Sequence, residues 1–401
     1  MTLDSYLRGT SPVDEMIMSA VDGIIPEKRL FTTISGKEAF SKGYNLCVPA
    51  NTKSDMSSTL IELAFRYIAK ILVSAYSNDI SCDPFENSVA SRSIENLKWR
   101  ISGEYYDELK ERYDYGVMRV TDYIDTGEDS SENIVQHCWF FAKLDICYRR
   151  GAVPSDVGQF FQPASDDEVK EILELAMKFR RAFIPSVIKP TSQIILNPQF
   201  GFGEYLIGEV DCDMIIDNTI VDLRADMGHG FPYEKVAKSL VYYLLTEINS
   251  EFSDTASAFP VKQLAFYSGR YGETEVLFIE DMNGNELNKA LEKIIIATEA
   301  KYKVKTHNFD EREAIKPPAR RTERENFLDE YDNREREEYN DGYNKVVEEK
   351  PHHIFRKILI FLIIISLLVV AFFYAKEWYT STYGADYSLN SILHNLFGWD
   401  I

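Results

Sequence analysis

The chain has 401 residues, a hydrophobic fraction of 45% and a formal net charge of −20 at pH 7. This length allows one large domain or two small ones. The charge argues against a protein whose whole surface binds nucleic acid, because affinity for phosphate comes mainly from lysine and arginine, although a local basic groove remains compatible with it. The five cysteines lie far apart without a CxxC pair, which predicts reduced thiols in a cytosolic domain.

Residues 1–190 are expected to form a mostly helical N-terminal part. Apolar side chains recur at helical spacing over residues 58–76 and over residues 133–149. Ser165 and Glu168 have the spacing of a capping box, which predicts the start of a third helix. No internal repeat is visible in this part or elsewhere in the chain.

Residues 191–304 are expected to form a mixed core and a closing helix. The pattern predicts a hairpin over residues 208–226, a helix over residues 233–249, and strands over residues 263–267 and 275–278. A closing amphipathic helix is expected over residues 285–303.

The hairpin carries acidic residues at positions where two like charges face each other. Apolar and other residues alternate on both arms, and Asp217-Asn218 makes a suitable two-residue turn. That turn places Asp213 opposite Asp222, with Cβ atoms about 5 Å apart. Such a pair usually holds a cation or has a raised carboxyl pKa. The alternative is a cross-strand salt bridge between Asp211 and Arg224, with Asp213 and Asp222 in solvent.

This arrangement resembles the core motif of the PD-(D/E)XK nucleases, in which an acid on one strand precedes Asp/Glu-x-Lys on the next. Asp213 matches the first acid, and Asp222-Leu223-Arg224 matches the second element with arginine in place of lysine. Further matching landmarks are Asn197-Pro-Gln-Phe200, the helix over residues 236–245 and the segment 266–272. The resemblance implies an α/β, restriction-endonuclease-like fold with a mixed sheet core and a large helical N-terminal part. The sequence itself adds one C-terminal transmembrane helix, described below.

The resemblance also implies a site. Asp213 and Asp222 would hold Mg²⁺ or Mn²⁺, which polarises a scissile phosphate and lowers the pKa of an attacking water. Arg224 would supply positive charge to a phosphoryl oxygen, although it cannot accept a proton. Lys238 would act as a relocated lysine, or it is an ordinary surface residue of an amphipathic helix. Glu62 would be the third acid found in many members of the family.

Two further residues near the motif have open roles. Arg270 either supports the site or anchors a turn through a salt bridge. His229 lies in a Gly-His-Gly loop beside the hairpin, where it touches substrate or is simply exposed.

The C-terminal residues predict attachment to a membrane. Residues 305–353 are rich in charged residues, which predicts a solvated tether. A transmembrane helix is expected over residues 354–379, because residues 358–375 form an uncharged apolar run. The basic flank Arg356-Lys357 places the N-terminal domain in the cytoplasm and residues 380–401 outside, at the inner membrane.

Together these features predict a membrane-anchored, metal-dependent DNA endonuclease that acts on incoming foreign DNA, such as phage or plasmid DNA. The alternative is a catalytically inactive membrane scaffold or sensor with the same fold, which binds protein or nucleic acid.

Overall fold

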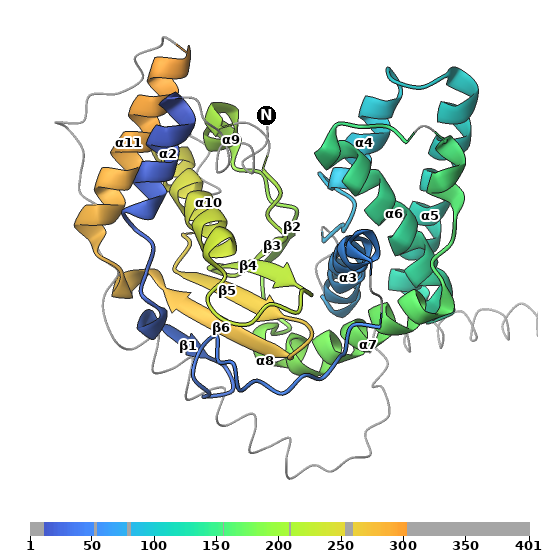
Figure 1. Cartoon of the computed structure of the whole chain (residues 1–401), viewed down its shortest axis with the longest axis horizontal. Coiled ribbons are helices and arrows are strands. Elements are labelled where there is room, and N and C mark those ends of the chain that lie inside the picture. Colours follow the sequence, from blue (N-terminus) through green and yellow to red (C-terminus); the bar gives the residue numbers. More distant parts are fainter. Residues whose placement is uncertain are drawn as a thin grey trace, which may run out of the picture. The chain divides into compact units, whose positions relative to one another are not determined.

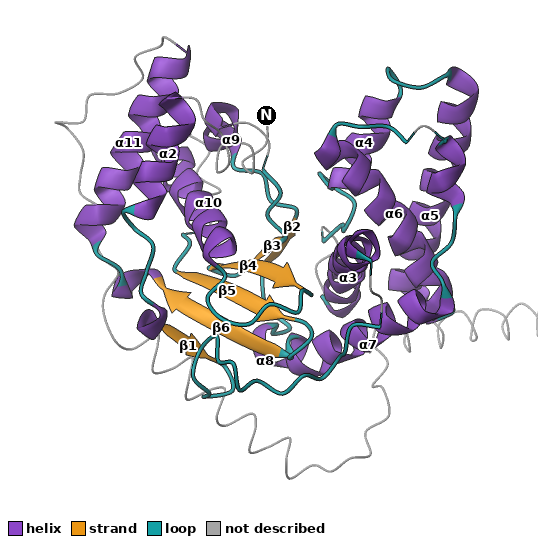
Figure 2. Ribbon diagram, viewed as in Figure 1, coloured by secondary structure: helices purple, strands orange, loops and turns teal. Residues whose placement is uncertain are grey.

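The computed structural model describes six stretches of the chain, all within one compact unit: residues 12–51, 54–77, 82–154, 156–207, 210–252 and 260–302. The predicted tether, transmembrane helix and external tail lie outside the described residues. None of the described helices is long and apolar enough to cross a membrane. The α/β class is confirmed, because the described residues form a mixed sheet together with many helices (Figure 2).

A six-stranded sheet forms the centre of the described residues. In spatial order its strands are β1 (Phe31–Thr33), β6 (Glu273–Phe278), β5 (Gln263–Ser268), β4 (Thr219–Arg224), β3 (Met214–Ile216) and β2 (Ile194–Leu196). β4 and β5 are parallel, and the other neighbours are antiparallel. Parallel neighbours need a crossover connection. Helix α10 (Tyr233–Phe252) lies on that connection.

The predicted hairpin and its register are confirmed. Ile216 pairs with Thr219 and Ile215 pairs with Ile220. Asp217 adopts φ 51° in the turn, a conformation that aspartate tolerates better than most residues. The first arm is shorter than expected, because pairing begins at Met214 and the residues from Val210 to Asp213 are irregular.

A helical layer covers one side of the sheet (Figure 1). The predicted helices occur here as α3 (Asp55–Tyr76), α6 (Ser131–Arg150) and α7 (Asp166–Ala182), and α7 begins with the expected reciprocal capping box. They are joined by α4 (Val89–Leu97), α5 (Gly103–Thr126) and α8 (Ile184–Val187). α3 is buried over most of its length and shares one hydrophobic core with Val221 and Leu223 of β4.

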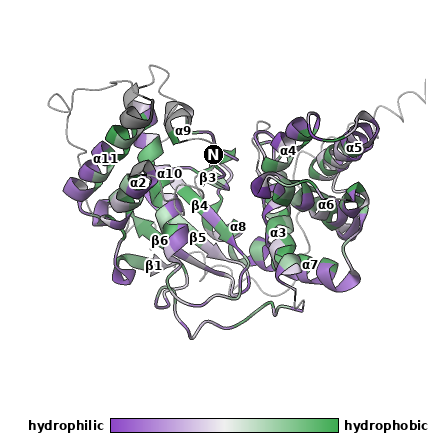
Figure 3. Ribbon diagram, turned by 45° about the horizontal axis from the view of Figure 1, so that its top comes forward, coloured by the Kyte–Doolittle hydropathy of each residue, from purple (hydrophilic) through white to green (hydrophobic). Residues whose placement is uncertain are grey.

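A second hydrophobic core lies on the other side of the sheet. It contains residues of α2 (Pro12–Asp22), α9 (Gly201–Ile207), α10 and α11 (Gly284–Tyr302), together with alternate residues of the strands, such as Ile220 and Phe266. Figure 3 shows hydrophobic residues along α3 and α10, the helices that contact β4 from the two cores. β4 is therefore held from both sides. Asp222 of β4 lies near Lys235 of α10, which also reaches Glu62 of α3.

Candidate active site

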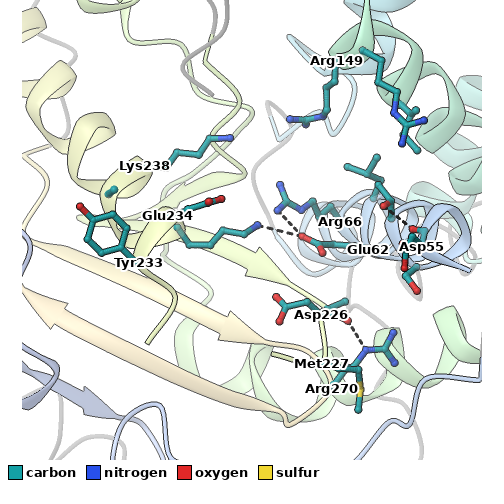
Figure 4. A pocket seen from close by; sticks show the side chains of 18 of the residues that line it. Asp55, Glu62, Arg66, Arg149, Asp226, Met227, Tyr233, Glu234, Lys238 and Arg270 are labelled. Carbon is teal, nitrogen blue, oxygen red and sulfur yellow. Dashed lines mark hydrogen bonds and ion pairs between the residues drawn. The ribbon is translucent and has the colours of Figure 1, made fainter. Parts of the chain in front are cut away.

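A cleft of about 910 Å³ lies beside β4, lined by α2, α3, α6, α10 and the residues that follow β4. Figure 4 shows Glu62 of α3 and Lys238 of α10 pointing into it from opposite sides. Its basic lining residues are about as numerous as its acidic ones, although the whole chain carries −20. The basic residues are Arg66, Arg149, Arg150, Lys235, Lys238 and Arg270.

The two aspartates of the predicted site are buried beside the cleft. Asp213 is 3% exposed and Asp222 is 7% exposed. One carboxylate oxygen of Asp213 accepts a hydrogen bond from the backbone N–H of Leu223 at 2.9 Å, so Asp213 lies against β4 next to Asp222. The alternative expectation of two solvated carboxylates is therefore wrong.

Cations from α3 compensate the charge of Asp213. Its two oxygens lie 3.3 Å from Lys70 Nζ and 3.6 Å from Arg66 Nη1. Lys70 also donates to Asn197 Oδ1 at 2.7 Å, which holds it in place. Burial alone would raise the pKa of Asp213, but Arg66 and Lys70 outweigh it and lower the pKa below its ordinary value. Asp213 is therefore ionised at neutral pH.

Asp222 has a different environment. Its Oδ2 is buried without a hydrogen-bond partner among the described residues and lies 3.9 Å from Lys235 Nζ. Burial raises the pKa of Asp222 above its ordinary value; Lys235 and Arg66 act against this, and Asp213 adds to it. Two adjacent carboxyls whose pKa values are pushed apart are typical of functional sites.

Glu62 lies on α3 in the same cleft and shares its cations with the aspartates. Its Oε1 accepts from Arg66 at 3.0 Å and from Lys235 at 3.2 Å. Burial opposes ionisation, but Lys235 and Arg66 prevail and lower the pKa of Glu62 to about 2. Lys235 thus bridges Glu62 and Asp222.

Arg224 is positioned away from the acid pair. It is 4% exposed, its Nε donates to Ser268 Oγ at 2.9 Å, and its Nη2 donates to the carbonyl oxygen of Gly228 at 3.4 Å. The cleft lining contains Lys235 and Lys238 but does not include Arg224. Arg224, which matches the motif lysine in the sequence, therefore links the C-terminal ends of the neighbouring strands β4 and β5.

Asp211 pairs with α6 and α10, so the alternative salt bridge to Arg224 is wrong. Lys238 Nζ lies 2.6 Å from Asp211 Oδ1, Tyr242 donates to the same oxygen at 3.1 Å, and Arg149 binds Oδ2. Burial would raise the pKa of Asp211, but Arg149 and Lys238 hold it well below its ordinary value. Lys238 therefore forms its ion pair with Asp211, and Lys235 is the α10 lysine that lies nearer to Asp222.

Three cations of the site were missed in the sequence. Arg66 and Lys70 follow Glu62 at intervals of four residues, which places all three on one face of α3. One signal could have identified Arg66 and Lys70: they form a row of charged residues in a helix that is otherwise largely apolar. Lys235 precedes Lys238 by three residues on the same face of α10, so spacing could not choose between them.

The donor set suits a cation that needs few protein ligands. Among the described residues, no group of three or more His, Cys, Asp or Glu side chains could hold a metal ion. Mg²⁺, however, is often bound by one or two carboxylates and completes its shell with water and substrate phosphate. The buried, unpartnered Oδ2 of Asp222 beside ionised Asp213 fits that mode.

Arg270 and His229, whose roles the sequence left open, also have defined partners. Arg270 forms a buried salt bridge with Glu171 at 2.6 Å, so it anchors the end of β5 to α7. The exposed His229 has its Nε2 3.0 Å from the hydroxyl oxygen of Tyr271.

Comparison with known proteins gives no relative. No protein-family model, no curated protein and no solved structure matches this chain.

Proposed function

We propose that this chain is a metal-dependent DNA endonuclease of the PD-(D/E)XK type, anchored in the inner membrane. The observation that carries the proposal is the carboxylate pair. Asp222, buried with one oxygen unpartnered among the described residues, lies beside ionised Asp213, next to a cleft whose lining includes both basic and acidic side chains. Such a pair suits a divalent cation, and the basic side chains suit phosphate.

The order of elements around the pair supports the restriction-endonuclease-like fold. Asp213 directly precedes β3, and Asp222 lies on the antiparallel neighbour β4. α10 and β5 follow at the positions that the resemblance assigns to a helix and a strand. This order supports the proposal, whereas the position of Arg224 does not.

Asp213 and Asp222 would hold the metal, and when bound it would polarise the scissile phosphate and acidify a water. Arg66 and Lys70 keep Asp213 ionised and therefore ready to act as a ligand. Lys235 takes the role that Arg224 cannot fill, because its Nζ lies between Glu62 and Asp222 and lines the cleft. Its positive charge is placed to stabilise the negative charge that develops on the phosphate.

The expected membrane anchor gives the activity a setting. An endonuclease at the inner membrane would meet phage or plasmid DNA as it enters. This part of the proposal rests on residues 354–379, which lie outside the described residues.

A scaffold or sensor is the second candidate, and one observation favours it. The charge of Asp213 is already compensated by Arg66 and Lys70, so the fold does not need a metal to relieve the repulsion between the aspartates. As a scaffold or sensor, the chain would bind protein or nucleic acid in the cleft and would not cleave the bound molecule.

A cleavage assay on the full chain in detergent separates the two candidates. With Mg²⁺ or Mn²⁺ we expect cleavage of labelled DNA, and Lys235→Ala should slow it by about 100-fold, the lower range for loss of one group that stabilises developing charge. Lys293→Ala, which removes an exposed lysine of α11, is the matched control and should leave the rate unchanged. Absence of cleavage with either ion favours the scaffold, and equal rates for the two variants would refute the role of Lys235.

A further inference from the structure

A second cavity lies away from the cleft, in the helical layer. It has a volume of about 330 Å³, within the range of small-molecule sites, and is lined by α5, α6 and the segment around η2 (Val157–Phe161). Its residues do not line the cleft. The proposed nuclease site makes no use of them.

One wall of this cavity carries a cation without an acidic partner. Arg112 of α5 has its guanidinium carbon 6.0 Å from the centre of the Tyr115 ring, and no carboxylate pairs with it among the residues that the structure describes. Arg119, about two turns further along α5, is instead paired with Asp129 at 2.6 Å. The cavity therefore has an excess of one positive charge, which favours an anionic ligand.

The adjoining wall is aromatic and includes a neutral imidazole. His137 of α6 is 5% exposed, and its Nδ1 has no partner among the described residues. A methyl group at Gly116 would lie 3.3 Å from that nitrogen, so Nδ1 faces α5. Burial, followed by Arg112, lowers the pKa of His137 to about 4, which keeps the ring uncharged at neutral pH.

Flat rings complete the lining. Tyr115 and His137 meet edge to face with centroids 5.8 Å apart, and Phe140 stacks on Phe161 at 6.4 Å. Aromatic faces bind planar rings by stacking, and guanidinium groups bind phosphate through paired hydrogen bonds. A ligand that has both a planar ring and a phosphate would engage both walls.

We infer that this cavity binds a nucleoside monophosphate or a close relative, with the phosphate on Arg112 and the base among the aromatic rings. α6 carries His137 in the cavity and Arg149 in the cleft, so the ligand would rest on a helix that also lines the candidate active site.

The test is a calorimetric titration of AMP and GMP into the full chain in detergent. At least one of the two should bind, and inorganic phosphate and the free nucleosides should bind at least tenfold more weakly. Arg112→Ala should raise the dissociation constant at least tenfold. Lys110→Ala, which removes an exposed lysine of the same helix that pairs with Asp114, should leave it unchanged.

A cleft variant separates this site from the proposed nuclease site. Asp213→Asn should leave nucleotide binding unchanged, even if it abolishes every effect of metal. The inference is overturned if neither nucleotide binds at millimolar concentration, if Arg112→Ala binds as well as the parent, or if Asp213→Asn removes the binding and so places it in the cleft. The melting temperature of Arg112→Ala is the control for folding. If it equals that of the parent, a loss of nucleotide binding does not come from unfolding.

Discussion

Replacing Glu171 with alanine should lower the free energy of unfolding by about 3–5 kcal/mol, the usual result of removing one partner of a buried ion pair. Glu171 is fully buried, and its oxygens accept from Arg270 Nη2 at 2.6 Å and from the backbone N–H of Asn51 at 2.7 Å. Arg270 is 2% exposed and also donates to the carbonyl oxygen of Ala225, just after β4. Without Glu171 a buried guanidinium would lose its counter-charge.

The measurement is urea unfolding of the full chain. Glu174→Ala removes a carboxylate from the same helix without breaking a described ion pair, and it should change stability by less than about 0.5 kcal/mol. The double variant Glu171→Ala with Arg270→Met should recover part of the loss, because no buried charge remains unpaired. Equal stability of Glu171→Ala and Glu174→Ala would contradict the anchoring role of Arg270.

Glu275→Gln should stabilise the protein at pH 8 and leave it almost unchanged at pH 4. Glu275 of β6 is fully buried, and burial raises its pKa from 4.5 to about 7, with Arg224 acting in the opposite direction. Between pH 4.5 and about pH 7 the folded state therefore binds more protons than the unfolded state. The contribution of this group is most favourable below pH 4.5 and is lost as pH rises to about 7, a difference of about 3 kcal/mol.

Urea midpoints at pH 4, 6 and 8 would check this sign. The parent should lose stability relative to Glu275→Gln between pH 4 and pH 8, whereas Glu95→Gln, a change at an exposed position of α4, should follow the parent at every pH. Parallel pH profiles for the parent and Glu275→Gln would show that the pKa of Glu275 is not raised in the folded protein. The result also bears on Arg224, whose charge lowers the pKa of this buried carboxyl.

The hairpin could be predicted from the sequence because its determinants are local. Asp217 and Asn218 fix the turn, the turn fixes the register, and the register brings Asp213 beside Asp222. The strand β1 could not be predicted, because its three residues are too few for an alternating pattern and its pairing partner lies in β6.

The cations of the site could not be assigned from the sequence for a related reason. Arg66 and Lys70 precede Asp213 by more than 140 residues, and only the packing of α3 against the sheet brings them to it. Arg224 was expected to reach the acids because of its position in the motif. In the fold its side chain instead contacts Ser268 on the neighbouring strand, a pairing that depends on the parallel register of β4 and β5.

The central claim is that Asp213 and Asp222 together hold a divalent cation, and calorimetric titration of Mn²⁺ into the full chain tests it most directly. We expect saturable binding, with a stabilisation of roughly 2.7 kcal/mol at a metal concentration about one hundred times the dissociation constant. Asp222→Asn should abolish the binding, because it removes the carboxylate of the pair whose Oδ2 is unpartnered among the described residues, and Arg224→Lys should preserve it. Absence of saturable Mn²⁺ binding by the parent, or unchanged binding by Asp222→Asn, would contradict the claim.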